Sequence, residues 1–313
     1  MILKLSLISF ITTLIILNIL LPFLTRNIYA EPSKRGMHSG NKPTGAGIFF
    51  ALIISIICYI KNFYLPLLCL PLSIISLLDD KYNIPRFIRY LSQVIFIISI
   101  YYLFKIDYSI SLFFNNFYIH YFILFLIIFF GTGIINLINF MDGIDGLVSG
   151  CFMVASFFIY INGDYNFLII IGSLLAFIIL NWYPSKIFMG DSGSIFLGSL
   201  IVSYALKSEN ILDGIKFLIL FTPLILDSTI CILLRIKNKQ KIFRAHKLHL
   251  YQRLVLNGFN HSTVSIMYIS ATFFIGIMYT FFNIYALLLS SFFTLIIGIF
   301  INNKYAIDFN KEK

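Results

Sequence analysis

Long apolar stretches, separated by short polar segments, follow one another along almost the whole chain. Runs of about 20 apolar residues are the signal of a helix that crosses a bilayer. The longest polar stretch runs only from Arg235 to Ser262, so no soluble domain fits between the runs. The pattern predicts an all-α polytopic integral membrane protein with a single transmembrane domain, residues 1–313. We expect ten or eleven spans, with candidates near residues 3–24, 46–61, 64–78, 87–104, 119–138, 147–162, 166–182, 193–207, 214–234, 263–281 and 284–301.

The composition agrees with this pattern. Of the 313 residues, 59% are hydrophobic and 12% are charged, and the mean hydropathy is +0.93. Soluble domains carry about 25% charged residues, so this chain cannot form an ordinary water-facing surface. The net charge of +10 indicates loops that lie against an anionic leaflet or bind anionic substrates, rather than a nucleic-acid-binding module. All four cysteines fall inside apolar runs, without metal-ligand spacing, which is typical of buried thiols.

The distribution of lysine and arginine predicts the orientation of the spans. The loops after the odd-numbered spans, with their flanks, hold all but five of the 23 basic residues. Those five, on the opposite side, are Lys4, Lys61, Lys105, Lys207 and Lys216. Because cytoplasmic loops are enriched in Lys and Arg, the first side is expected to be cytoplasmic. The N-terminus is then outside and the C-terminus inside.

Five polar segments on the predicted cytoplasmic side carry the candidate functional side chains. These are "KRGMHSGNKPTGAG" (34–47), "LLDDKYNIPR" (77–86), "NLINFMDGIDGL" (136–147), "NWYPSKIFMGDSGS" (181–194) and "FRAHKLHLYQR" (243–253). A site is therefore expected in the cytoplasmic loops. Asp227 is an exception because it falls within a span, where a charge is costly and usually faces protein or a water-filled cavity. We interpret it as lining the site or pairing with a cation.

The segment 136–147 places four oxygen-bearing side chains at every third position: Asn136, Asn139, Asp142 and Asp145. For as long as the helix continues, they share one face. Hard cations such as Mg²⁺ take oxygen ligands, typically one or two carboxylates together with substrate phosphates. Asp191 adds a carboxylate in a glycine-rich segment, although an acid there could also cap a helix. These residue types favour a metal–phosphate site.

The segment 243–253 contributes cationic side chains. His246 and His249 are three residues apart, and Arg253 follows them. We favour contacts to phosphate, which such donors recognise, over a zinc site. Zinc normally recruits a third nearby ligand, and this segment supplies none. Of the remaining histidines, His38 is assigned to the same cluster, and His120 and His261 are interpreted as incidental.

Together these segments resemble a known family. "NFMDGIDGL", "IFMGDSGSIFLG", "LLDDKYNIPRFIRYLSQ" and "AHKLHLYQRL" are similar to motifs of the polyprenyl-phosphate N-acetylhexosamine-1-phosphate transferases, glycosyltransferase family four. The likeness extends over about residues 34–253, and the histidine segment is most similar to that of the WbpL type. The MraY type carries adjacent histidines, which this chain lacks.

The resemblance implies a phosphotransferase that moves N-acetylhexosamine-1-phosphate from a UDP-sugar to undecaprenyl phosphate. The products are undecaprenyl-diphospho-N-acetylhexosamine and UMP. Such a reaction initiates the synthesis of O-antigen, part of lipopolysaccharide, or of another cell-envelope polysaccharide. It implies Mg²⁺, for which Mn²⁺ can substitute, and a multi-pass protein of the bacterial inner membrane whose site faces the cytoplasm.

The resemblance also implies roles for individual residues. Asn139 and Asp191 match the expected metal ligands. The catalytic acids are Asp79, Asp80, Asp142 and Asp145, of which the first two are expected to position the acceptor phosphate and the others to contact the nucleotide sugar or support the metal. The substrate-binding residues are expected to be His38, Asn136, His246, His249 and Arg253.

Several alternatives stay open. An MraY-type phospho-MurNAc-pentapeptide transferase of peptidoglycan synthesis would use the same chemistry. An ion-coupled transporter belongs to a different class, but transporter sites usually lie near the middle of the bilayer on broken helices of repeated halves. The sequence does not decide the sugar, the pathway or the choice between a monomer and a homodimer. It also does not decide between one in-line displacement and a double displacement through an aspartyl intermediate.

Overall fold

The computed structural model describes residues 1–27, 29–30, 42–104, 117–208, 210–241 and 246–309. In this part the chain is almost entirely helical, with one short antiparallel pair, β1 (Tyr29–Ala30) and β2 (Lys42–Pro43). The helices are α1 (Ile2–Asn27), α2 (Gly47–Ile60), α3 (Leu65–Tyr82), α4 (Arg86–Leu103), α6 (Phe117–Phe140), α7 (Leu147–Ile161), α8 (Phe167–Asn181), α9 (Gly190–Lys207), α10 (Ile211–Ile219), α11 (Thr222–Lys237), α12 (Leu250–Leu256), α13 (His261–Phe281) and α14 (Ile284–Tyr305). The predicted all-α fold is confirmed.

Each predicted span except 214–234 coincides with one helix. The exception is divided: α10 ends at Ile219, α11 begins at Thr222, and the two helices are bent by 81°. Pro223 lies in the first turn of α11. Proline has no N–H to donate, and its ring clashes with the carbonyl four residues earlier, so one straight helix cannot run through this position. The prediction of a single continuous span was wrong because it gave Pro223 no weight.

Several helices have the length and composition of membrane spans. Among the described residues these are α1, α4, α6, α13 and α14, and the bent pair α10–α11 would make a sixth. Helices α2, α7 and α8 are apolar but shorter. On α14, large apolar side chains such as Leu289 and Phe292 are more than half exposed, as expected for a surface that contacts lipid rather than water. The protein is a multi-pass membrane protein.

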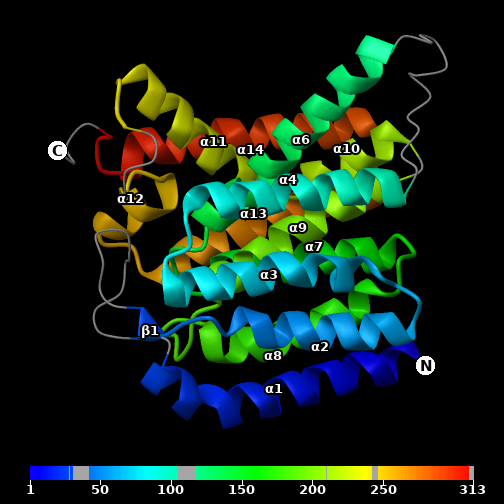
Figure 1. Cartoon of the computed structure of the whole chain (residues 1–313). Coiled ribbons are helices and arrows are strands. Elements are labelled where there is room, and N and C mark those ends of the chain that lie inside the picture. Colours follow the sequence, from blue (N-terminus) through cyan, green and yellow to red (C-terminus); the bar gives the residue numbers. More distant parts are fainter. Residues whose placement is uncertain (28, 31–41, 105–116, 209, 242–245, 310–313) are drawn as a thin grey trace.

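Helix α9 lies in the interior of the bundle and packs against α2, α3 and α6 (Figure 1). Most of its residues are buried, including the four serines Ser192, Ser194, Ser199 and Ser203. The hydroxyls of Ser199 and Ser203 donate to backbone carbonyls one turn earlier, so these polar groups are satisfied within the helix. Helix α9 therefore has many small side chains and a low hydropathy for a buried helix. It carries Asp191 in its first turn.

Four polar connections lie at the same end of the bundle, which we call the motif end; their described residues are 83–85, 141–146, 182–189, and 238–241 with 246–249. They are brought together by contacts described below, and the end of α14 lies on the same side in Figure 1. There Ile307 accepts a hydrogen bond from Arg253 over 2.9 Å. All the motif residues within the described ranges therefore come from one end of the molecule.

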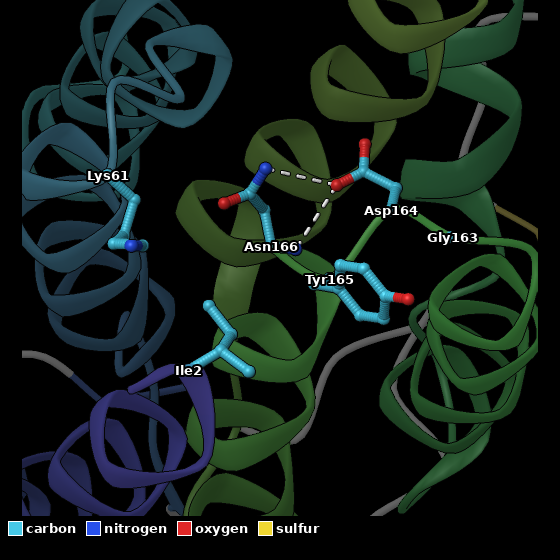
Figure 2. A pocket seen from close by; sticks show the side chains of 6 residues that line it. All are labelled: Ile2, Lys61, Gly163, Asp164, Tyr165 and Asn166. Atoms are coloured by element: carbon cyan, nitrogen blue, oxygen red, sulfur yellow. Dashed lines mark hydrogen bonds between the residues drawn. The ribbon is translucent and has the colours of Figure 1, made fainter.

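The opposite end carries the N-terminus. Met1 Sδ lies 4.0 Å from Lys61 Nζ, in the connection between α2 and α3. A pocket of about 580 Å³ is lined there by Ile2, Lys61 and residues 163–166 (Figure 2). Asp164 does not reach toward the motif end but accepts two hydrogen bonds from Asn166. The start of α1 and the end of α14 therefore lie at opposite ends of the bundle.

Candidate active site

Three charged side chains from three helices meet at the motif end. Arg89, in the first turn of α4, donates through Nη1 to Asp79 Oδ2 near the end of α3. The same nitrogen lies 3.4 Å from Asp191 Oδ2, at the start of α9. The structure therefore brings together Asp79 and Asp191, which lie 112 positions apart in the sequence. The sequence pattern places Arg89 only among the basic residues that flank the loops, because nothing in its local pattern marks it as a partner of distant acids.

Asp80, the neighbour of Asp79, lies against the turn that begins α9. A methyl group placed on Gly190 would come 3.2 Å from Asp80 Oδ2 and 2.8 Å from Thr44 Oγ1. Gly190 also has a φ of +68°, which favours glycine. Glycine at position 190 therefore allows the backbone to approach the Asp80 carboxylate closely.

The predicted oxygen-bearing stripe divides where α6 ends. Asn136 and Asn139 lie on the last turns of α6, whereas Asp142 and Asp145 lie in the following turn, residues 141–146, and are no longer on the helix. Asn139 Oδ1 accepts a hydrogen bond from Ser194 Oγ on α9. This contact places Asn139 beside the first turn of α9, which also carries Asp191.

Asn136, predicted to bind substrate, is engaged inside the bundle. Its amide exchanges two hydrogen bonds with the amide of Gln93 on α4, of 2.7 Å and 3.3 Å, and donates another to Thr132 O over 2.7 Å. Gln93 is buried. Asn136 therefore links α4 to α6 by hydrogen bonds, three residues before Asn139.

Asp142 and Asp145 have different surroundings although they belong to one motif. Asp142 is half-buried, and burial raises its pKa to about 8, with the charges of Asp191 and Asp145 adding to the effect. Asp145 is 1% exposed and accepts hydrogen bonds from the N–H and Oγ of Ser185, over 3.1 Å and 2.9 Å. His261 Nδ1 lies 3.5 Å from Asp145 Oδ2.

Burial alone would raise the pKa of Asp145, but the bonds from His261 and Ser185 outweigh it and lower that pKa. Asp145 therefore ties the turn 141–146 to the connection 182–189 and to α13. The interpretation of His261 as incidental was wrong, because its contact with Asp145 joins distant parts of the sequence. His120 contacts Tyr101, away from these residues.

The histidine segment is largely enclosed by protein. His249 is 4% exposed, and its Nδ1 lies 3.8 Å from Asp227 Oδ1. Arg253 is 5% exposed and donates to Leu248 O over 3.0 Å, to Ile307 O, and to Asn302 Oδ1. The structure thus gives both predicted substrate-binding residues protein partners. His246 is half-buried, and the predicted substrate-binding residue His38 lies outside the described residues.

A third potential metal ligand comes from outside the segment. In the part of the chain that the structure describes, Cys231 of α11 joins His246 and His249 in a group whose ligand atoms lie within 4.8 Å of one another. However, His246 Nδ1 accepts a hydrogen bond from Leu248 N–H over 3.2 Å. The lone pair of Nδ1 is then occupied by this hydrogen bond, and the neutral ring carries its proton on Nε2. Neither nitrogen is therefore ready to bind a metal. Sulfur and imidazole ligands suit zinc, whereas the oxygen ligands around Asp191 suit magnesium.

Comparison with known proteins identifies the family. The sequence profile of glycosyl transferase family 4 matches residues 62–209, which include all four predicted catalytic acids and both predicted metal ligands. A phospho-N-acetylmuramoyl-pentapeptide-transferase of Dictyoglomus turgidum is 30% identical over 240 residues, which cover 69% of this chain and 76% of that protein. The chain belongs to glycosyl transferase family 4.

Two other relatives of this family 4 protein match over more of its length. A probable undecaprenyl-phosphate N-acetylglucosaminyl 1-phosphate transferase of Bacillus subtilis (strain 168) is 29% identical over 284 residues, 81% of this chain and 78% of that protein. A phospho-N-acetylmuramoyl-pentapeptide-transferase of Staphylococcus carnosus is 29% identical over 314 residues, 86% of this chain and 95% of that protein. The names of these relatives differ in the group that is transferred: N-acetylglucosaminyl 1-phosphate in one, and phospho-N-acetylmuramoyl-pentapeptide in the others.

Proposed function

We propose that this protein transfers a sugar-1-phosphate from a UDP-sugar to a polyprenyl phosphate, and that the donor sugar is an N-acetylhexosamine. The observation that supports this most directly is the gathering of Asp79, Asp80, Asp142 and Asp191 at one end of a membrane bundle. A lipid-linked acceptor requires a membrane enzyme, and a nucleotide donor requires a site that water can reach. The name of the Bacillus subtilis relative includes such an acceptor, undecaprenyl phosphate, and the names of both relatives include an N-acetylated sugar with a phosphate as the transferred group.

The chemistry of the ligands at this end fits Mg²⁺. Asn139 and Asp191 would hold the ion, with Mn²⁺ able to substitute, because both supply oxygen ligands beside the first turn of α9. Burial, together with the negative charges of Asp191 and Asp145, raises the pKa of Asp142. A bound Mg²⁺ supplies positive charge that stabilises these carboxylates and the phosphates of the donor.

Asp79 and Asp80 are assigned to placing the acceptor phosphate. In the proposed reaction an oxygen of that phosphate forms a bond to the β-phosphorus of the UDP-sugar, the bond from this phosphorus to the bridging oxygen breaks, and UMP leaves. The second pKa of a phosphate monoester is about 6, so the acceptor is mostly dianionic at neutral pH and needs little help from a base. Arg89 would keep Asp79 and Asp191 in fixed positions until the phosphates arrive.

Asp142 is assigned to the nucleotide sugar or to support of the metal, since it is half-buried beside the other acids. Asp145 would act indirectly, by fixing the turn that carries Asp142. For the histidine segment we propose a role for His246 at the donor phosphates, because it is less buried than His249.

The proposed setting is the bacterial inner membrane with the motif end in the cytoplasm, where UDP-sugars are found. This orientation is supported by the excess of Lys and Arg in the connections at that end. The proposed biological role is the start of O-antigen or another cell-envelope polysaccharide. Transfer of phospho-MurNAc-pentapeptide in peptidoglycan synthesis is the second candidate, because the relatives from Dictyoglomus turgidum and Staphylococcus carnosus carry that name.

One experiment tests the reaction and separates the candidates. Purified protein is incubated with undecaprenyl phosphate, Mg²⁺ and, one at a time, UDP-N-acetylhexosamines and UDP-MurNAc-pentapeptide, and the lipid products are identified by mass spectrometry. We expect a lipid diphospho-N-acetylhexosamine and UMP, and neither with the Asp191→Asn variant. Product from UDP-MurNAc-pentapeptide alone would support the second candidate. No lipid product from any donor, together with ion-driven uptake into vesicles, would replace the enzyme with a transporter.

A further inference from the structure

A carboxylate of α11 receives the first turn of another helix. Asp227 is buried, and its two oxygens accept hydrogen bonds from Leu250 N–H over 2.8 Å and Tyr251 N–H over 3.2 Å. These are the first two residues of α12. The first N–H groups of a helix have no partner within the helix, so a carboxylate placed there both satisfies them and favours the helix electrostatically. Asp227 therefore acts as a cap for α12 that is supplied by a different helix.

Asp227 is itself held in place. Tyr268 Oη on α13 donates to Asp227 Oδ2 over 2.6 Å. On the far side of α12, Arg253 bonds to the C-terminal segment through Ile307 O and Asn302 Oδ1. The short helix α12 is thus fixed to α11, α13 and α14 rather than stabilised by its own length.

One side chain of α12 reaches the turn that carries Asp142. Tyr251 is 1% exposed, and its Oη donates to Phe140 O over 3.0 Å, at the last residue of α6. The phenol also packs directly on Gly143: a methyl group at that position would lie 2.1 Å from Tyr251 Oη and 2.9 Å from its Cζ. The ring therefore fills the space behind the turn, and Gly143 is the residue whose lack of a side chain makes the contact possible.

We propose that Tyr251 is a positioning residue for the turn 141–146, and that Asp227 fixes Tyr251 by capping α12. Tyr251 bonds to Phe140 and packs on Gly143, on either side of Asp142, so its place determines where the Asp142 carboxylate stands. This inference rests on the proposed function, in which Asp142 serves the nucleotide sugar or its metal. In this proposal Asp227 acts by capping α12, which requires no contact with substrate or lipid.

The first test removes one hydroxyl group. Tyr251→Phe keeps the ring but loses the bond to Phe140, and we expect kcat/KM for the UDP-sugar to fall about fivefold to tenfold, the effect of losing one hydrogen bond of ordinary strength. KM for undecaprenyl phosphate and the melting temperature should stay near wild type. Tyr285→Phe is the matched control, since Tyr285 is 73% exposed on α14. If KM for undecaprenyl phosphate rose by the same factor by which kcat/KM for the UDP-sugar fell, the proposal would be overturned.

The second test is a double-mutant cycle. Gly143→Ala should lower kcat/KM in the wild-type background, because its methyl group collides with Tyr251 Oη. In the Tyr251→Phe background that oxygen is gone, so the same substitution should cost less. Equal costs in the two backgrounds would show that Tyr251 and the turn are not coupled. Asp227→Asn, which weakens the cap, should reproduce the donor-selective loss seen with Tyr251→Phe.

A third measurement does not depend on catalysis. Hydrogen exchange of peptides that cover 141–146 should be faster in Tyr251→Phe than in wild type, while peptides within α7 and α8 are unchanged. Unchanged exchange in the turn would overturn the positioning role even in an active enzyme. Conversely, faster exchange in a protein whose wild type turns over none of the UDP-sugars would sustain the positioning role and reject the proposed function, so the two failures are distinguishable.

Discussion

Asp142 and Asp145 belong to one motif, but their local surroundings shift their pKa values in opposite directions. The folded protein keeps the Asp142 proton up to about pH 8, whereas the unfolded chain loses it near the ordinary pKa of an aspartate. Ionisation of Asp142 therefore costs stability, and the cost grows as the pH rises through that window. Asp145 has a lowered pKa, so its charged form stabilises the fold above the ordinary pKa and is lost as the pH falls.

This difference predicts that the same substitution affects stability differently at the two positions. At pH 8, with EDTA present, Asp145→Asn should destabilise the protein by about 2 kcal/mol, because hydrogen bonds to a buried charge are lost. Asp142→Asn should cause no loss of stability, since it removes a charge that the fold disfavours, yet it should remove most activity. Thermal unfolding in detergent, alongside the transfer assay, checks both. A larger destabilisation by Asp142→Asn would contradict the division of roles.

The metal ligands allow a second test at this scale. We expect EDTA to abolish transfer, Mg²⁺ to restore it, and Asp191→Asn to fold normally while losing most activity. Cys231→Ser serves as the matched control: it disrupts the sulfur and histidine group but leaves the oxygen ligands intact, so Mg²⁺-dependent activity should persist. Restoration by Zn²⁺ alone, with loss in Cys231→Ser, would move the metal to Cys231, His246 and His249.

At the scale of helices, the apolar runs predicted the positions of the spans because lipid-facing and core-facing residues are both apolar. The same signal could not predict α12, whose seven residues are held by Asp227 of α11 and, through Arg253, by Ile307, both from distant parts of the chain. Nor could it predict Arg89, Ser185 or Ser194 as partners of the acids, since these contacts exist only in the folded protein. Pro223 was the one local signal available for the broken span.

The crossing of α2 and α9 gives a prediction at this scale. A methyl group at Gly47 would lie 2.2 Å from Gly193 Cα and 2.7 Å from Met189 O, all backbone atoms, so the helices would have to separate. Gly47→Ala should therefore destabilise the protein by about 1–3 kcal/mol, the usual cost of overpacking, and lower activity by moving Asp191.

The matched control is Gly298→Ala on α14, where nothing lies within 4 Å of the added methyl group. It should leave both the melting temperature and the transfer rate near wild type. Equal melting temperatures for Gly47→Ala and Gly298→Ala would mean that α2 and α9 can separate without cost.

For the whole molecule, the testable property is which end faces the cytoplasm. A cysteine introduced at Lys239, at the motif end, should react with a membrane-impermeant thiol reagent only after the inner face is opened. One introduced at Asn210, at the other end, should react in intact cells. The four native cysteines are buried, so they give little background. Labelling in the reverse sense would place the motif residues away from cytoplasmic UDP-sugars and reject the proposed function.

The serine-rich interior helix bears on how the protein is made. Helix α9 is too polar to count among the apolar spans, so on its own it would gain little by leaving the insertion machinery for lipid. Its hydroxyls and glycines suit a site already surrounded by α2, α3 and α6, all of which precede it in the chain. We therefore expect α9 to enter the membrane only after α2, α3 and α6 have assembled around its place, which makes the order of synthesis part of building the site.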